Sequence, residues 1–194
     1  MGSIRFLKCR ECGAEYPAVF KYICDECFGP LDVIYDIPSN LTKETFTARQ
    51  DKTYWRYFEL LPIADKNHIV NIHAGFTPLQ HAEDLGTHMG NLKNLFIKND
   101  SVNPTFSFKD RPAGVAISRS REIDLKAVGC ASTGNLASAT AAHAAKAHLP
   151  CYIFAPSDIE KVKIAQALSY GAKFVAVEGT YDDANRVASI IGES

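Results

Sequence analysis

The feature that most restricts the fold of this chain is a regular alternation of short apolar runs and longer helical stretches in its last third. The apolar runs cover 127–131, 151–155 and 174–177, and the helical stretches cover 135–148, 158–170 and 181–191. Strands that alternate with helices in this way form a parallel sheet with helices on its faces. We therefore expect an α/β fold.

Residues typical of helix ends mark the expected boundaries. Ser157 or Asp158 can cap the helix over 158–170, because their side-chain oxygens accept hydrogen bonds from free N–H groups of a first turn. Gly171 can close the same helix in a left-handed conformation. Thr180 can cap the helix that follows.

Size and charge exclude several classes of protein. The chain has 194 residues, of which 46% are apolar, which suits one or two globular domains with a real core. Its net charge of -1, without a Lys/Arg cluster, supplies no field for nucleic acid or an anionic membrane. The sequence contains neither 18 consecutive apolar residues nor the apolar region of a signal peptide, so we expect a soluble cytoplasmic protein.

Four cysteines near the N-terminus form two C-x-x-C pairs, Cys9 with Cys12 and Cys24 with Cys27. Two such pairs supply the four thiolates of a tetrahedral zinc site, and Gly13 and Gly29 follow the pairs where tight turns need backbone freedom. A closed four-cysteine shell is structural, and the binding energy would fold a head over 1–37 that has little core. Disulfides, a redox pair, an iron site and a ribbon that binds nucleic acid or protein are the alternatives.

A second chemical signal is the stretch NPTFSFKDRPAG, in which Lys109 stands between aromatic residues and an Asp-Arg pair. We expect a helix from about Lys109 to Arg121, with Pro112 in its first turn. Phe106 and Phe108 would surround the lysine with apolar side chains, and both this setting and a helix N-terminus favour the neutral, nucleophilic amine.

A third signal is the stretch CASTGNLASATAAHAAKA, in which an apolar strand leads into an alanine-rich helix. Free N–H groups at the helix start, together with the side chains of Ser132, Thr133 and Asn135, can receive a carboxylate or another anionic oxygen. An ordinary capped helix explains the same residues equally well. His143 and His148 do not share a helix face and are interpreted as solvated or packing histidines.

Taken in order, these motifs resemble the threonine synthase family of fold type II pyridoxal phosphate enzymes. The resemblance covers the cysteine head, GFTPL, NPTFSFKDR, CASTGN and KIAQALSYGAKFVAVEGTYDDA. It implies a tryptophan synthase beta-like fold, incomplete in this chain, behind a zinc ribbon. It also implies that Lys109 forms the Schiff base with pyridoxal phosphate, that Asn135 binds the 3'-oxygen of the cofactor, and that Ser132 and Thr133 bind anionic groups of the substrate.

The reaction implied by the resemblance converts O-phospho-L-homoserine and water to L-threonine and phosphate. Cysteate synthase, or another fold type II lyase such as a serine/threonine dehydratase, is the alternative enzyme. A non-catalytic fragment or binding paralogue is the alternative outside enzymes. The oligomeric state is open, with a homodimer among the options.

The chain departs from the family at two positions and at its end. Phe106 stands where the family often has a small or aliphatic residue, and Pro112 stands where glycine or alanine is frequent. The glycine-rich loop that cradles the cofactor phosphate and the segment that grips the substrate phosphate would lie beyond Ser194. We therefore expect a zinc head over 1–37, the first part of the cofactor domain over 38–125, a truncated small domain over 126–194, and little activity of the isolated chain.

Overall fold

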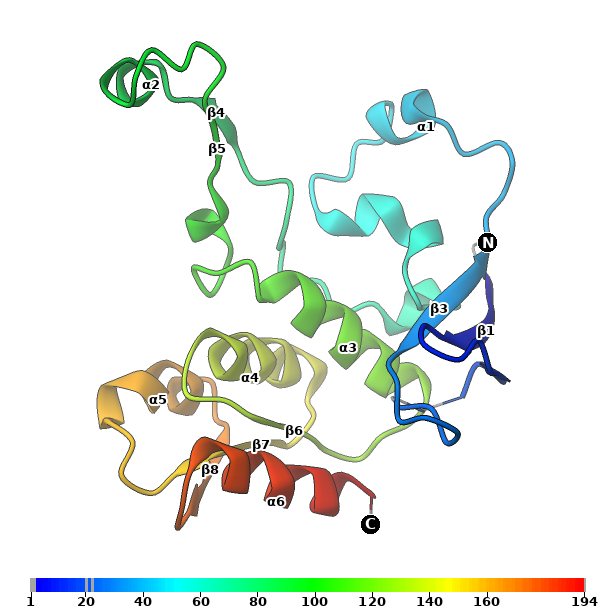
Figure 1. The fold of residues 1–194 in the computed structure, drawn as a ribbon, viewed down its shortest axis with the longest axis vertical. Coiled ribbons are helices and arrows are strands. Elements are labelled where there is room, and N and C mark those ends of the chain that lie inside the picture. The colour runs from blue at the N-terminus through cyan, green and yellow to red at the C-terminus, as the bar shows by residue number, and fades with distance from the viewer. Residues whose placement is uncertain (1–2, 20, 22, 194) are drawn as a thin grey trace.

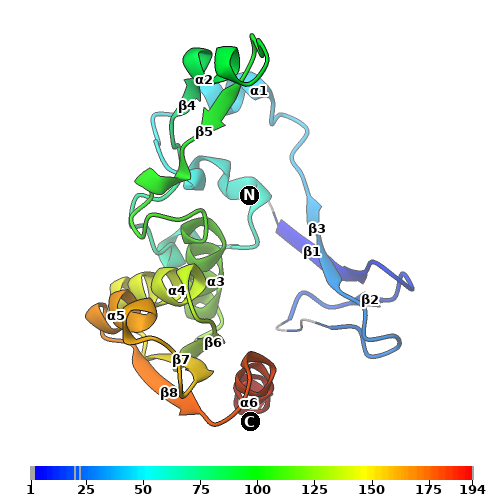
Figure 2. The ribbon, with the colours of Figure 1, turned by 60° about the vertical axis from the view of Figure 1, so that its left-hand side comes forward.

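The computed structural model describes residues 3–19, 21 and 23–193, and it places a small antiparallel sheet at one edge of the molecule (Figures 1 and 2). This sheet has the order β2-β1-β3. Its strands are β1 (Ser3–Cys9), β2 (Glu15–Tyr16) and β3 (Leu31–Asp36). We refer to residues 3–36 as the head.

The segment between the head and the alternating region consists of short elements. These are α1 (Lys43–Thr47), the 3-10 helices η1 (Tyr54–Leu60), η2 (Lys66–His68) and η3 (Asp100–Val102), the strands β4 (Leu79–His81) and β5 (Phe96–Lys98), and α2 (Glu83–His88). Strands β4 and β5 pair antiparallel, and their side chains are exposed. Tyr54, Trp55 and Phe58 form a buried cluster in this segment, whereas Tyr57 is 43% exposed.

The last part of the chain has the expected α/β architecture. Its elements are α3 (Asp110–Glu122), β6 (Val128–Ala131), α4 (Asn135–Ala147), β7 (Cys151–Pro156), α5 (Lys161–Ser169), β8 (Lys173–Val177) and α6 (Tyr181–Glu193). The strands form a parallel sheet in the order β6-β7-β8. Helices α4 and α5 lie on one face with α3 packed on α4, and α6 covers the other face (Figure 1). The predicted parallel sheet with flanking helices is confirmed.

The structure tests the predicted helix ends one by one. Gly171 is left-handed with φ +84°, as predicted. Thr180 and Asp183 cap α6 reciprocally: the Thr180 N–H donates to Asp183 Oδ2 (2.9 Å), and the Asp183 N–H donates to Thr180 Oγ1 (3.3 Å). The cap predicted at residues 157–158 is wrong, because α5 starts only at Lys161. The Ser157 N–H instead donates to the Val177 carbonyl (2.9 Å) and prolongs the sheet.

The hydrophobic core that holds α3 in place contains residues from segments before and after this helix in the sequence. Val70 and Ile117 pack with Ala137, Ala141 and Ala144 of α4, and all five are nearly inaccessible to solvent. Small side chains along α4 let the two helices approach closely. Helix α3 is thereby anchored to the α/β layer.

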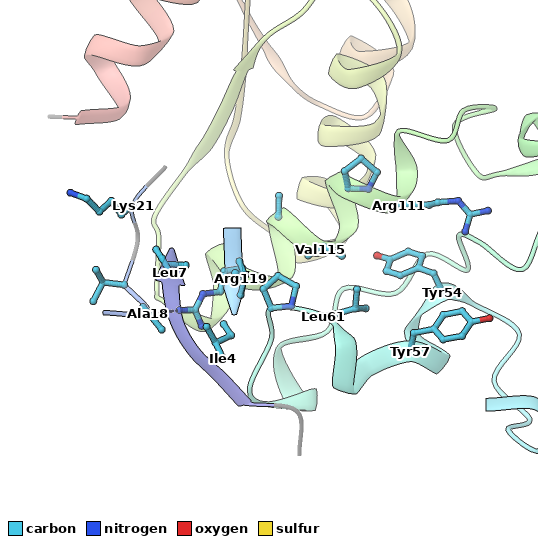
Figure 3. Close-up of a pocket in the computed structure, with 15 residues that line it drawn as sticks. Ile4, Leu7, Ala18, Lys21, Tyr54, Tyr57, Leu61, Arg111, Val115 and Arg119 are labelled. Atoms are coloured by element: carbon cyan, nitrogen blue, oxygen red, sulfur yellow. Dashed lines mark hydrogen bonds between the residues drawn. The ribbon is translucent and has the colours of Figure 1, made fainter. Parts of the chain in front are cut away.

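An apolar cavity of about 610 Å³ lies between the head and α3 (Figure 3). Leu7 lines it from the head, Leu61 from the segment after η1, and Val115 from α3. The Arg119 guanidinium donates to the Ala18 carbonyl (3.2 Å) at the cavity wall and ties the head to α3.

Within the described ranges, no helix combines the length and the apolar character that a membrane span requires.

Candidate functional site

The turn that precedes α3 presents Lys109. Asp110 Oδ2 accepts the N–H of Thr105 (2.8 Å), and Ser107 Oγ accepts the N–H of Lys109 (3.1 Å). These bonds close the turn over 105–109, so that Lys109 is the N-cap residue of α3. The predicted helix start is confirmed, and Pro112 lies in the first turn, where its missing N–H costs no hydrogen bond.

The two phenylalanines that flank the lysine lie at the surface. Phe106 is 73% exposed and Phe108 is 55% exposed. The Lys109 ammonium lies 4.8 Å from the centre of the Phe108 ring, a cation–π contact, while the Lys109 residue is half-buried. The expectation of an apolar enclosure is wrong for the described part of the chain, because both rings face solvent.

Phe106 has a left-handed backbone with φ +61°, which is costly for any residue with a Cβ atom. We expect Phe106→Gly to raise the free energy of unfolding by up to about 1 kcal/mol, because strain is relieved while an exposed ring gives up little packing. Urea unfolding measures this change. Phe108→Gly is the matched control, since Phe108 has no positive φ, and it should destabilise the chain; a loss of stability in Phe106→Gly would contradict the strain.

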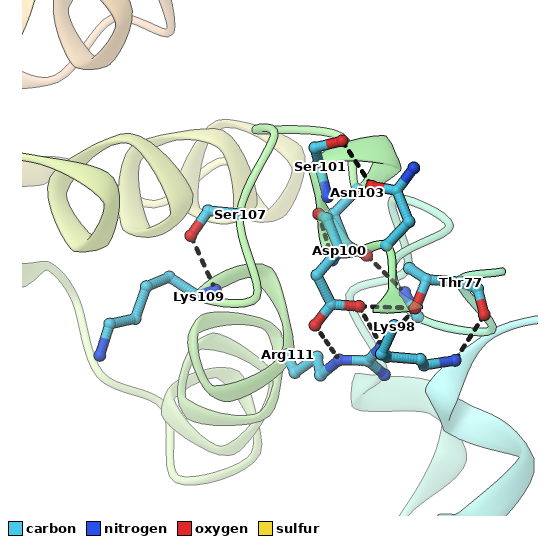
Figure 4. A network of polar contacts seen from close by, with 10 residues as sticks. Thr77, Lys98, Asp100, Ser101, Asn103, Ser107, Lys109 and Arg111 are labelled. Atoms are coloured by element: carbon cyan, nitrogen blue, oxygen red, sulfur yellow. Dashed lines mark hydrogen bonds and ion pairs between the residues drawn. The ribbon is translucent and has the colours of Figure 1, made fainter. Parts of the chain in front are cut away.

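A polar network ties the start of α3 to two other motifs (Figure 4). The Arg111 guanidinium donates to Asp100 Oδ1 (2.9 Å) and to Thr77 Oγ1 (3.1 Å), and the Thr77 hydroxyl donates to the same carboxylate (2.5 Å). The Arg111 guanidinium holds the pKa of Asp100 below its usual value, and the Thr77 hydrogen bond acts in the same direction. Asn103 Oδ1 also accepts the N–H of Gly75 (2.9 Å). The stretches GFTPL, KND and SFKDR therefore form one unit.

Asp100→Asn tests this network. We expect the free energy of unfolding to fall by about 1.5–3 kcal/mol, because the variant leaves the partly buried Arg111 without its charged partner. Thermal or urea unfolding checks the value. Asp124→Asn is the control: its ion pair with Lys126 is 81–85% exposed, and its loss should cost less than about 0.5 kcal/mol. If both variants lost the same amount of unfolding free energy, the network would not stabilise the fold more than an exposed ion pair does.

In the loop between β6 and α4, the Ser132 side chain caps the start of the helix, as the ordinary capped-helix alternative expects. Ser132 is buried, and its Oγ accepts the N–H groups of Gly134 (3.3 Å) and Ala137 (3.1 Å). Its hydroxyl proton remains available to donate. Asn135 is the exposed first residue of α4, and its own N–H has no partner among the residues that the structure describes.

The structure packs the helix that has Lys109 as its N-cap against the helix that follows the Ser132 loop, but the side chains of the two motifs do not bond to each other in the described ranges. Helices α3 and α4 pack on each other, yet no hydrogen bond joins Lys109 to Ser132, Thr133 or Asn135 within the described ranges. In Figure 4 the Lys109 side chain extends away from the Arg111 network.

The sequence analysis missed Thr77, Asp100 and Arg111, although they lie in or beside the stretches that it singled out. It also missed the buried partner of His143. His148 is exposed, but His143 is fully buried, with Nε2 at 3.4 Å from Asp110 Oδ1. The sequence signal for this pair is a histidine within an alanine-rich helix, and this signal does not identify Asp110 as the partner.

The four head cysteines converge. All four Sγ atoms lie within 4.8 Å of one another, and none is in a disulfide. The Cys9–Cys27 and Cys12–Cys24 pairs are each 3.5 Å apart. Tetrahedral zinc with Zn–S bonds of about 2.3 Å requires sulfurs about 3.8 Å apart, so the donor set fits this metal.

The two cysteine turns have the same hydrogen bonds. Cys9 and Cys24 each donate their N–H to the carbonyl five residues later (2.8 and 3.0 Å) and accept the N–H four residues later (3.1 and 3.0 Å). The left-handed residue is Gly13 in the first turn, as predicted, but Phe28 in the second. The prediction of backbone freedom at Gly29 is wrong; a Cβ there would lie 3.1 Å from Cys9 Sγ, so Gly29 provides space.

Tyr16 supports this cluster. Its oxygen accepts the N–H of Asp25 (3.0 Å), and its hydroxyl can therefore donate to Cys24 Sγ, which lies at 3.1 Å. This hydrogen bond is the largest of the causes that lower the pKa of Cys24 to about 6. Cys24 is thus a thiolate near neutral pH, the form that binds a metal.

Residues 70–194 match the family model described as pyridoxal-phosphate dependent enzyme. The threonine synthase of Methanocaldococcus jannaschii is 40% identical over 182 residues, which are 91% of this chain and 44% of that protein. The threonine synthase of Methanosarcina acetivorans is 40% identical over 180 residues, 92% of this chain and 44% of that protein. The chain therefore spans less than half the length of these curated relatives.

Solved structures agree on the fold. The processed form of threonine deaminase isoform 2 from Solanum lycopersicum matches with a TM-score of 0.55 and 32% identity, over 60% of this chain and 32% of that chain. A pyridoxal 5'-phosphate-dependent aspartate racemase matches with a TM-score of 0.55 and 26% identity, over 60% of this chain and 37% of that chain. With a family model over most of the chain and a parallel α/β layer that carries a lysine at a helix start, the chain belongs to the family of pyridoxal-phosphate dependent enzymes.

Proposed function

We propose that this chain carries the lysine-bearing part of the active site of a threonine synthase. The observation that supports it best is the position of Lys109, half-buried at the start of a helix that packs on the helix following the Ser132 loop. The two relatives that match more than nine-tenths of the chain at 40% identity are both named threonine synthase.

The residues present fit pyridoxal phosphate. Lys109 supplies a primary amine, which can bond to the aldehyde carbon of the cofactor, and the exposed Asn135 amide can donate to its 3'-oxygen. When bound, pyridoxal phosphate supplies an electron sink for the carbanion formed at the substrate α-carbon. The contacts to the cofactor phosphate would come from the part of the relatives that this chain does not span.

Each residue has a defined task in this proposal. The Lys109 amine would hold and return protons at Nζ as general base and acid. Ser132 donates its free hydroxyl proton to an anionic oxygen of the substrate, and Thr133 adds a second hydroxyl. The unpaired N–H of Asn135 contributes the partial positive charge of a helix N-terminus.

The proposed substrate is O-phospho-L-homoserine, with water as co-substrate and L-threonine and phosphate as products. The likeness to a threonine deaminase structure at 32% identity favours a second candidate, a lyase that releases ammonia from a hydroxyamino acid. Cysteate synthase and a non-catalytic paralogue complete the alternatives. We propose that the isolated chain has little or no activity, because it spans 44% of its relatives.

The test of the substrate uses the protein encoded by the full reading frame. Incubated with pyridoxal phosphate and O-phospho-L-homoserine, it should release phosphate and form threonine in equal amounts. Ammonia release from threonine or serine, without phosphate release, would assign a deaminase. Turnover of neither substrate by a protein that binds the cofactor would contradict a threonine synthase.

We also propose that the head binds one structural zinc ion through Cys9, Cys12, Cys24 and Cys27. The sulfur separations and the Tyr16 hydrogen bond to Cys24 support it. The division into a head over 1–37, a cofactor-domain segment over 38–125 and a small domain over 126–194 remains a prediction. The same holds for a cytoplasmic location, for a homodimer and for the absence of nucleic-acid and membrane partners.

A further inference from the structure

Three buried polar side chains from different elements meet at Gly114. They are Tyr54 of η1, Asp110 of α3 and His143 of α4. Within the described ranges, the Tyr54 hydroxyl, both ring nitrogens of His143 and Oδ1 of Asp110 are buried without a hydrogen-bond partner. A buried polar group without a partner destabilises the folded state, so several of them at one place require an explanation.

The three side chains lie in the order Tyr54, His143, Asp110, with the histidine in the middle. Nε2 of His143 lies 3.4 Å from Oδ1 of Asp110, and both side chains have zero exposure. A Cβ on Gly114 would clash with the Tyr54 hydroxyl oxygen and with Cε1 of the His143 ring (2.6 Å), and it would lie 3.0 Å from Nδ1 of the same ring. The tyrosine hydroxyl and the second ring nitrogen therefore occupy the same small space over α3, which only glycine leaves open.

The hydrogen-bonding capacities of the three groups select one arrangement. Burial, followed by the charge of Asp110, raises the pKa of Tyr54, so its hydroxyl keeps its proton and can donate. Asp110 can only accept when ionised, and a neutral imidazole donates through one nitrogen and accepts through the other. All three are satisfied when Tyr54 donates to Nδ1 and Nε2–H donates to Asp110. This arrangement requires the 3.4 Å contact between Nε2 and Oδ1 to shorten by about 0.5 Å and the Tyr54 hydroxyl to turn and approach Nδ1, because neither hydrogen bond is formed in the structure.

We propose that Tyr54, His143 and Asp110 form a buried hydrogen-bonded relay that sets the turn presenting Lys109. The second oxygen of Asp110 accepts the N–H of Thr105 at 2.8 Å, and this bond closes the turn over 105–109. The orientation of the carboxylate, and with it the turn, thus depends on a histidine of α4. His143 is a positioning residue that acts through Asp110, and its consequence for cofactor attachment rests on the proposed function of Lys109.

The first test is independent of the cofactor. Loss of the Nε2–H donor in His143→Leu should speed exchange of the Thr105 backbone amide by about tenfold or more, the equivalent of one hydrogen bond. His143→Gln retains an N–H donor near the position of Nε2 and should stay within about threefold of the unmodified chain. His148→Asn, on the exposed end of the same helix, is the control and should change nothing. Unaltered Thr105 exchange in His143→Leu, or equal loss in both His143 variants, overturns the relay.

A spectroscopic readout covers the case in which His143→Leu does not fold. Nitrogen NMR of the unmodified chain should show the His143 ring protonated on Nε2 and unprotonated on Nδ1. Tyr54→Phe, which removes only the hydroxyl, should shift the Nδ1 resonance by removing its donor. A proton on Nδ1, or an Nδ1 signal unaffected by Tyr54→Phe, overturns the proposal.

A third measurement separates this inference from the proposed function. Pyridoxal phosphate is added, the product is reduced with borohydride, and the label on Lys109 is followed with time. The label should accumulate about tenfold more slowly in His143→Leu and at a nearly unchanged rate in His143→Gln. No label on Lys109 in the unmodified chain would refute the assignment of Lys109, while Thr105 exchange and the ring signals would still decide the relay.

Discussion

Lys109→Ala abolishes the attachment of pyridoxal phosphate that borohydride can trap on this chain. The expected loss is complete, because reduction fixes the cofactor only where a primary amine has bonded to its aldehyde carbon, and alanine has none. Lys109 lies in the turn closed by Asp110 and Ser107, which positions one amine reproducibly, whereas exposed lysines react at random. The measurement is an absorbance spectrum before and after reduction, followed by peptide mapping.

Lys126→Ala is the matched control for this experiment. Lys126 pairs with the exposed Asp124, and its side chain is 81% exposed, so its removal should leave the label on Lys109 intact. Because the chain spans less than half of its relatives, the cofactor concentration must be raised until labelling saturates. A trapped label that persists in Lys109→Ala, or that is spread evenly over surface lysines, would contradict the assignment.

We expect removal of the proposed zinc ion to unfold the head while the α/β layer remains folded. Structural zinc contributes about 10–16 kcal/mol in small cysteine domains, far more than a sheet of this size can supply from its own core. Among the described residues of the head, Leu7, Cys9 and Cys24 are the buried apolar residues, which is too few to replace the proposed metal. Chelation should therefore expose residues 3–36 to protease and to rapid amide exchange.

Cys24→Ser and Cys130→Ser form the matched pair for this prediction. Cys24 is one of the four convergent thiols and is hydrogen-bonded to Tyr16, so its loss should abolish stoichiometric zinc. Cys130 lies in β6, away from the cluster, and its replacement should leave the zinc content at one ion per chain. Protease resistance of the head that survives chelation, or zinc retained by Cys24→Ser, would rule out a structural zinc site.

Features that depend on neighbouring residues in the chain were predictable. The alternation of apolar runs and helical stretches after residue 126 predicted the parallel sheet, because strand and helix periods are local properties. Gly171 and Thr180 act as the sequence predicted, since a left-handed glycine and a reciprocal cap involve only adjacent turns. The helix after β7 was misplaced, because Ser157 pairs with Val177 on the next strand and so continues the sheet.

The candidate site was predicted less completely than the fold. The motif with Lys109 and the Ser132 loop were recognised as chemically unusual, and the structure brings the helices that carry them together. The environment of the lysine was not predicted correctly. The exposure of Phe106 and Phe108 depends on whether other segments of the chain pack over them, and the local sequence does not show this. Arg111 forms hydrogen bonds with Asp100 and with Thr77, and Thr77 lies more than thirty residues earlier in the chain. No local sequence pattern predicts such long-range pairs.

By itself, the sequence determined the class of fold and the two cysteine pairs, because each depends on residue type and short-range spacing. It determined the family through the resemblance of its ordered motifs, which include the stretch with Lys109. Only the tertiary structure decided which buried groups meet. Asp110 and His143 lie on different helices, and Tyr54 comes from a third element; none of the three has a sequence signal that names its partner. Their meeting depends on the close approach of α3 and α4 over Gly114, which is a property of packing between elements.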